Sequence, residues 1–216
     1  MKKETVKKFF EFLEKKEGKE RITAKLILTP ESLPEGLETR SGLNLSHTSV
    51  KSLPRGLKVN GNFWLKHTSL QSLPEGLEVK GSLILDGTPI RSLPEGLKVG
   101  VSLGLRKTFI QYLPKGLEVG GNLLLVNSSI KLLPEGLEVK GLLDLENTPI
   151  KYLPKGLKIE TDLEIQHTAI QSLPEGLEVG RDLLIRNTPL SEKYTIEEIR
   201  KMIEEEGGYV KGGIYL

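Results

Sequence analysis

The sequence repeats the tetrapeptide Leu-Pro-x-Gly, followed directly by leucine, eight times at an unbroken spacing of twenty residues. A fixed period of this length indicates one supersecondary unit that stacks on copies of itself. Such a stack forms an elongated scaffold, whose function depends on the surface residues that interrupt the repeat. The repeat therefore constrains the architecture more than the function. Its prolines are Pro34, Pro54, Pro74, Pro94, Pro114, Pro134, Pro154 and Pro174.

Each copy contains two short segments of alternating apolar and outward-facing residues. In the copy from Leu77 to Leu97, these segments surround Val79 and Leu83–Leu85, and Gly81 lies at the bend between them. Alternation of period two predicts two short strands, each with one buried face. Pro94 predicts a turn after them, because proline fixes φ and lacks a backbone donor. Each copy thus supplies roughly six apolar residues to a central column, with adjacent coils ~4.8 Å apart.

The run from Leu83 to Leu97, LILDGTPIRSLPEGL, resembles the LxLxxNxLxxLPxxL core of leucine-rich repeats, closest to the short bacterial type. The resemblance covers about residues 22–190, with threonine in place of the usual asparagine in most copies. It implies a mainly β fold, a leucine-rich-repeat-like parallel β-solenoid of about eight 20-residue coils. Chains of this type also resemble uncharacterised bacterial and bacteriophage proteins, which implies a microbial or viral origin.

The two ends of the chain predict caps for the stack. Residues 1–20 carry an amphipathic pattern that predicts an N-terminal capping helix, and residues 21–190 form the repeat solenoid. In residues 191–216, Thr195 and Glu198 predict a capping box at the start of a helix, and Gly207-Gly208 ends that helix. The segment Val210–Leu216 aligns with Val79–Leu85 and predicts a final β rung. We expect all three regions to form one structural domain.

The bulk composition excludes several classes of function. The formal net charge is +2, with 31 Lys and Arg against 29 Asp and Glu, so no basic field indicates a nucleic-acid partner. The absence of cysteine excludes disulfides and cysteine nucleophiles, and it permits a reducing compartment. The first residues do not resemble a secretory signal, and no apolar stretch reaches membrane-spanning length. We therefore expect a cytoplasmic protein, of a bacterium or of a phage-infected host, with no membrane contact.

Residues twenty positions apart form columns on the surface of such a stack. The column from Glu38 to Glu178 alternates glutamate and lysine along most of its length. We interpret this pattern as a structural charge ladder, in which each cross-coil pair contributes a few tenths of a kcal/mol.

The outward strand column is irregular and is therefore a candidate binding face. Trp64 is the only tryptophan, and aromatic side chains on exposed sheets are typical interface anchors. The resemblance to leucine-rich repeats also points to this face, because that family usually binds partners there. The partner-binding candidates are Trp64, Lys66, His67, Ile84, Asp86, Leu124, Asp144 and Glu164.

A second candidate patch interrupts the serine column that precedes each Leu-Pro. Tyr112, Leu132 and Tyr152 replace this serine in three consecutive copies, with Phe109 nearby. Three adjacent bulky residues indicate self-association or a second partner, or they simply cover a corner of the coil.

No constellation of residues predicts catalysis, a cofactor or a metal. The three histidines, His47, His67 and His167, occupy one corner column. Only His47 and His67 would be stacked neighbours, close enough to share a metal, and no third ligand is placed to complete a site. Asp144 and Glu164 are neighbours on the sheet face, but nothing marks them as an acid–base pair.

We expect a non-enzymatic protein–protein interaction scaffold that binds an unidentified protein through the variable outward face of its sheet. The alternative is a structural or assembly protein, of an oligomer or a virion, that associates through Tyr112, Leu132 and Tyr152.

Overall fold

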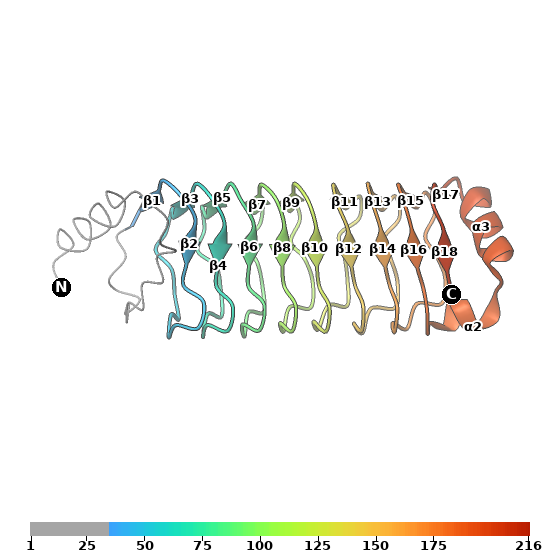
Figure 1. Cartoon of the computed structure of the whole chain (residues 1–216), viewed down its shortest axis with the longest axis horizontal. Helices are drawn as coiled ribbons and strands as arrows, with labels where there is room; N and C mark the ends of the chain where they lie inside the picture. The colour runs from blue at the N-terminus through green and yellow to red at the C-terminus, as the bar shows by residue number, and fades with distance from the viewer. Residues whose placement is uncertain (1–34) are drawn as a thin grey trace.

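The computed structural model describes residues 35–216, which form a parallel β-solenoid. Successive coils stack along the long axis of the molecule, and two helices lie at the C-terminal end (Figure 1). The predicted fold class is therefore confirmed. The expected N-terminal capping helix, residues 1–20, lies outside the described residues.

One wall of the solenoid is a continuous parallel sheet of nine two-residue strands, each paired with the strand of the next coil. The pairing joins residues twenty positions apart, as in Leu103 with Leu123, and Leu123 with Leu143. The strands are β2 (Leu43–Asn44), β4 (Phe63–Trp64), β6 (Leu83–Ile84), β8 (Leu103–Gly104), β10 (Leu123–Leu124), β12 (Leu143–Asp144), β14 (Leu163–Glu164), β16 (Leu183–Leu184) and β18 (Ile214–Tyr215).

A second strand in each coil builds the neighbouring wall, as the extra alternating segment predicts. This wall consists of two parallel sheets, one of five strands and one of four. The five are β1 (Glu38–Thr39), β3 (Lys58–Val59), β5 (Glu78–Val79), β7 (Lys98–Val99) and β9 (Glu118–Val119). The four are β11 (Glu138–Val139), β13 (Lys158–Ile159), β15 (Glu178–Val179) and β17 (Tyr209–Val210).

The wall divides between β9 and β11, where no backbone hydrogen bond joins adjacent coils. The repeat would place the carboxylates of Glu118 and Glu138 opposite each other at this point, and like charges in that position destabilise a strand pair. The nine-stranded wall is continuous at the same level, because Leu123 N–H donates to the carbonyl of Leu142 at 2.8 Å. The interruption, which we call the seam, therefore affects one wall only.

Two positions in each coil adopt a left-handed backbone conformation. The first is the glycine of Leu-Pro-x-Gly, where φ lies between 64° and 71°. The second is the corner position of the histidines, where φ of His67 is 53° and φ of Asn127 is 57°. Asparagine, histidine and glycine tolerate this conformation best, and they fill seven of the eight corner positions from 47 to 187. Backbone conformation thus explains the histidine column without a metal.

Most hydroxyls of the threonine column bond to the backbone inside the corner, whereas those of Thr68 and Ser128 have no partner among the described residues. Thr88 Oγ1 donates a hydrogen bond to the carbonyl of Leu85 at 2.6 Å, and Thr108 repeats this bond to Leu105 at 2.7 Å. A short hydroxyl can therefore replace the larger amide of the usual leucine-rich pattern, because its acceptor lies three residues earlier in the same coil.

The core is a column of apolar side chains, six from each coil. In one coil these six side chains are at most 7% exposed, and they pack against their equivalents in the adjacent coils. They are Leu93, Leu97, Val99, Leu103, Leu105 and Ile110.

The C-terminal cap consists of α2 (Pro189–Lys193) and α3 (Ile196–Glu205), each of which begins with a capping box. The box of Thr195 and Glu198 at the start of α3 was predicted, whereas the short α2 was not. The predicted final rung is also confirmed, since Ile214 pairs with Leu183. Arg200 of α3 donates to the carbonyl oxygens of Val210 at 2.8 Å and Gly212 at 3.0 Å, and so covers acceptors of the last coil.

Replacement of a core leucine should destabilise the whole stack. Leu123 is fully buried, so Leu123→Ala should lower the free energy of unfolding by ~2–5 kcal/mol because it leaves a cavity. The control is Asn127→Gly, since glycine accepts the left-handed φ of this exposed corner. Urea denaturation measures both values, and equal losses would show that the inward and outward faces are misassigned.

Candidate functional site

The outward face of the nine-stranded sheet carries the column that the sequence analysis singled out. Strand pairing places Trp64 beside Ile84, and Asp144 beside Glu164. Gly104, which pairs with Ile84 on the next coil, has no side chain and separates the apolar pair from the rest of the column. The candidates therefore form two groups, an apolar one towards the N-terminus and an acidic one further along, with Leu124 between them.

The apolar group is more buried than the sequence predicts. Trp64 and Ile84 are only partly exposed. A methyl group at Gly42 would lie 3.2 Å from the Trp64 ring, and one at Gly104 would lie 3.1 Å from Ile84 Cδ1. The two side chains thus cover glycines of adjacent coils, and part of their surface is already used for packing within the chain.

The predicted polar neighbours of Trp64 separate in the structure. Lys66 Nζ lies 3.5 Å from a carboxylate oxygen of Asp86, so these two side chains form an ion pair on the sheet face. His67 lies at the corner instead, where its ring stacks on His47 with centroids 5.1 Å apart. His67 therefore belongs to the corner and not to the surface around Trp64.

The outward column that contains Asn62, Asn122 and Asp182 joins adjacent coils through hydrogen bonds. The backbone N–H of Ser82 donates to Asn62 Oδ1 at 2.8 Å, and the N–H of Leu142 donates to Asn122 Oδ1 at 3.0 Å. At the last rung, the N–H of Gly213 donates to Asp182 Oδ1 at 2.8 Å. These polar side chains have a structural role, because each satisfies a donor of the next coil.

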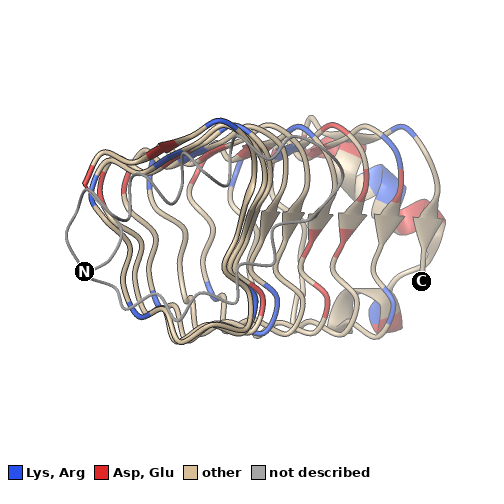
Figure 2. Ribbon diagram, turned by 60° about the vertical axis from the view of Figure 1, so that its left-hand side comes forward, with Lys and Arg blue, Asp and Glu red and all other residues tan. Residues whose placement is uncertain are grey.

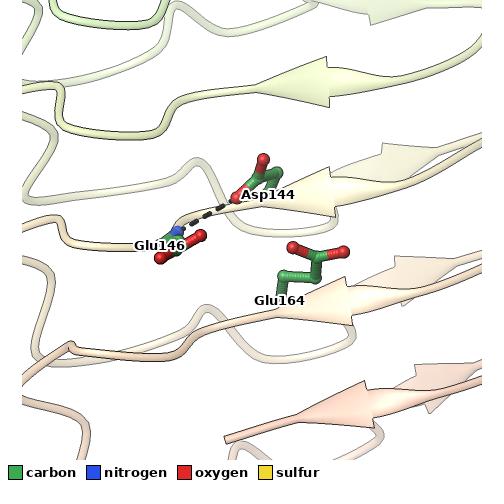
Figure 3. Close-up of side chains that lie close together, drawn as sticks. All are labelled: Asp144, Glu146 and Glu164. Carbon is green, nitrogen blue, oxygen red and sulfur yellow. Dashed lines mark hydrogen bonds between the residues drawn. The ribbon is translucent and has the colours of Figure 1, made fainter. Parts of the chain in front are cut away.

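The acidic group gathers three carboxylates, those of Asp144, Glu146 and Glu164, whose nearest oxygens all lie within 4.8 Å of one another (Figure 3). Asp144 is 6% exposed and accepts a hydrogen bond from the N–H of Glu146 at 3.2 Å. The guanidinium of Arg106 lies 4.0 Å from Asp144 and is the neighbouring positive charge. Glu146 was missed in the sequence, although its position two residues after Asp144 places it on the same face.

The environment of this cluster favours protonated carboxyls. Burial raises the pKa of Asp144 above its ordinary value, despite the opposing effects of the Glu146 N–H and of Arg106. Burial also raises the pKa of Glu164, and the neighbouring carboxylates of Asp144 and Glu146 raise it further. Three carboxylates could supply oxygen ligands to a divalent cation, but such clusters are common without one, and Arg106 already offers a counter-charge.

The second candidate patch is the most exposed apolar surface of the repeats. Phe109, Tyr112, Leu132 and Tyr152 are 51%, 59%, 60% and 64% exposed. Tyr112 and Leu132 pair in a parallel β-bridge, so their side chains lie side by side on adjacent coils. The guanidinium of Arg91 lies over the Phe109 ring, 5.4 Å from its centroid. We call Phe109, Tyr112, Leu132 and Tyr152 the corner ridge.

A groove lies on the other wall, over β5, β7, β9 and β11. Its volume is about 820 Å³, and it crosses the seam. Its charged lining includes Lys98 and Glu118, whose side chains already pair at 2.6 Å. We therefore assign no ligand to this groove.

Comparisons with known proteins do not assign a family to the chain. No protein-family model matches it, and no curated protein matches it at a significant level of similarity. Within the described residues, no helix has the length and apolar character needed to cross a membrane.

Replacement of the most buried carboxyl should change the pH dependence of stability. The raised pKa means that folded Asp144 holds its proton more tightly than unfolded Asp144, so stability falls as pH rises through the folded pKa. Asp144→Asn should therefore raise Tm at pH 7, and this gain should shrink below about pH 4, where the carboxyl is protonated in both states. Asparagine fits the column, because Asn44 Oδ1 accepts the N–H of Ser46 at 3.0 Å.

The measurement is thermal unfolding of both chains across this pH range. Asp182→Asn controls for the loss of one negative charge from the same sheet. A lower Tm for Asp144→Asn at pH 7 would show that ionised Asp144 stabilises the fold through Arg106 more than its burial destabilises it.

Proposed function

We propose that this chain is a non-enzymatic scaffold that binds another protein. The observation that carries the proposal is the corner ridge, where four large apolar side chains are more than half exposed on three consecutive coils. Contiguous apolar surface of this kind marks interaction sites in soluble proteins. Tyrosine and phenylalanine also offer rigid contact area at low entropic cost, and aromatic residues are enriched at protein interfaces.

The rigid stack supports this role. Tyr112 and Leu132 are held in register by the bridge between their coils, and Tyr152 occupies the same column one coil further. The three side chains are therefore positioned before a partner arrives. Preorganisation of this kind raises affinity, because less conformational entropy is lost on binding.

The sheet face is the second candidate for the binding surface. Trp64 is the largest aromatic side chain of the molecule, is partly exposed, and lies beside the ion pair of Lys66 and Asp86. Because Trp64 also packs over Gly42, its truncation should reduce stability as well as any binding. The corner ridge offers more apolar surface with a smaller structural role, so it ranks first.

Membership of the leucine-rich-repeat family and a bacterial or bacteriophage origin remain proposals, supported by the repeated LxLxxTxIxxLPxxL run. A cytoplasmic location is likewise a proposal, consistent with a sequence that contains no cysteine.

Affinity measurements on ridge and sheet variants test the function. A partner captured by the tagged full chain would be purified, and its affinity measured by calorimetry for the wild type and variants. The double variant Leu132→Ser/Tyr152→Ser should lower affinity at least ~30-fold, as expected for interface anchors worth ~2 kcal/mol or more. It should leave Tm almost unchanged, because both side chains are mainly solvent-exposed.

Trp64→Ala is the matched variant for the sheet face. Loss of affinity with Trp64→Ala alone would move the binding surface to the sheet. If no purified protein binds the chain directly, the proposed function is wrong.

A further inference from the structure

The charged side chains on two sides of each coil differ in whether they form ion pairs with the next coil. On the edge formed by the odd-numbered strands, lysines pair with glutamates of the next coil, as Lys58 does with Glu78 at 2.7 Å and Lys158 with Glu178 at 2.9 Å. This is the predicted charge ladder, and it neutralises that edge. The corner with the ridge has no such ladder.

The corner carries positive charges on five coils of the repeat and no negative charge at its outward positions. It comprises the outward positions of residues 47, 49, 51 and 52 and their equivalents every twenty residues, up to residue 172. None of these positions holds Asp or Glu, although the chain contains 29 such residues. Figure 2 shows both blue and red segments along the lower turns of the stack, and Asp86 and Glu146 directly precede corner positions 87 and 147. The corner cations are Lys51, Arg91, Lys107, Lys131 and Lys151.

The corner lysines nearest to the ridge form no ion pair with the part of the chain that the structure describes. Lys107, Lys131 and Lys151 are exposed, and no carboxylate within residues 35–216 forms an ion pair with any of them. Lys131 directly precedes Leu132, and Lys151 directly precedes Tyr152. The most exposed apolar side chains are thus flanked by positive charges that form no ion pair within residues 35–216.

We propose that the corner ridge binds an acidic protein segment, in which Asp or Glu residues flank apolar side chains. This inference rests on the proposed function and names the class of partner. Apolar side chains of the segment would pack on Leu132 and Tyr152, while its carboxylates would pair with Lys131 and Lys151. Complementary charge of this kind steers association and excludes basic partners.

Two other occupants fit the corner less well. A symmetric contact with a second copy of the chain would bring two cationic corners together, and like charges oppose such a contact. A single-stranded nucleic acid would need flat aromatic rings on successive coils, but Leu132 stands at the centre of the ridge.

A random peptide library displayed on phage, selected against the immobilised full chain, tests the partner class. Selected peptides should contain more Asp and Glu than Lys and Arg, together with leucine or aromatic residues. Fluorescence anisotropy with a synthesised selected peptide should show weaker binding in about 1 M than in about 0.1 M NaCl, where the Debye length is about 3 and about 10 Å.

Charge reversal locates the site. Lys131→Glu/Lys151→Glu should lower affinity for the peptide roughly tenfold or more, since it turns attraction into repulsion at two positions. The control is Lys80→Glu/Lys201→Glu, which makes the same change in net charge at exposed positions outside the corner and should leave affinity unchanged.

The other outcomes are distinguishable. The inference is overturned if selected peptides are not acidic, if no peptide is selected, or if an oligonucleotide of thymidines binds the corner more tightly than the peptide. Peptides that bind normally to the charge-reversed variant but not to Trp64→Ala would also overturn it, and would leave the scaffold function in place. Concentration-dependent dimerisation lost in Leu132→Ser would replace the acidic partner with a second copy of the chain.

Discussion

The structure depends on the parallel hydrogen-bond ladder between residues twenty positions apart. A single coil cannot bury its six apolar side chains, so each coil is stable only against its neighbours. Parallel pairing keeps these neighbours in one register, and a shift by one residue would turn the inward leucines outward. The columns of the solenoid follow from this constraint, including the left-handed corner positions and the buried threonine hydroxyls, most of which bond to the carbonyl three residues earlier.

The seam shows that the coils stay stacked even where one pair of strands lacks its hydrogen bonds. β9 and β11 lack hydrogen bonds at the step where two glutamates would face each other, while β10 and β12 remain paired at the same level. The core column continues past the seam, because Leu123 and Leu143 are fully buried. One continuous wall together with the core therefore keeps the coils stacked where the other wall lacks its hydrogen bonds. The charge ladder elsewhere on that wall thus contributes to register, since opposite charges accompany the strands that do pair.

The coils, the strand register, the terminal rung and the capping box of α3 could be predicted from the sequence, because each depends on a local pattern repeated many times. The candidate site was less predictable, since it depends on which side chains meet. Trp64 is partly buried because it covers Gly42, and Asp144 is buried beside Glu146. Neither contact follows from a twenty-residue period. The composition of the corner could be predicted from the columns. Its significance depends on a structural fact, that Lys131 and Lys151 form no ion pair within the described residues.

Amide hydrogen exchange along the full chain tests the ladder most directly. Backbone amides that donate across coils, such as those of Leu103 and Leu105, should exchange slowly, and this protection should recur every twenty residues. At the seam, the amides of Glu138 and Lys140 should exchange faster than the equivalent amides of Glu118 and Gly120, which donate to the preceding coil at 3.0 and 2.9 Å. Protection without a twenty-residue period would contradict the stacked register, and slow exchange at Glu138 and Lys140 would contradict the seam.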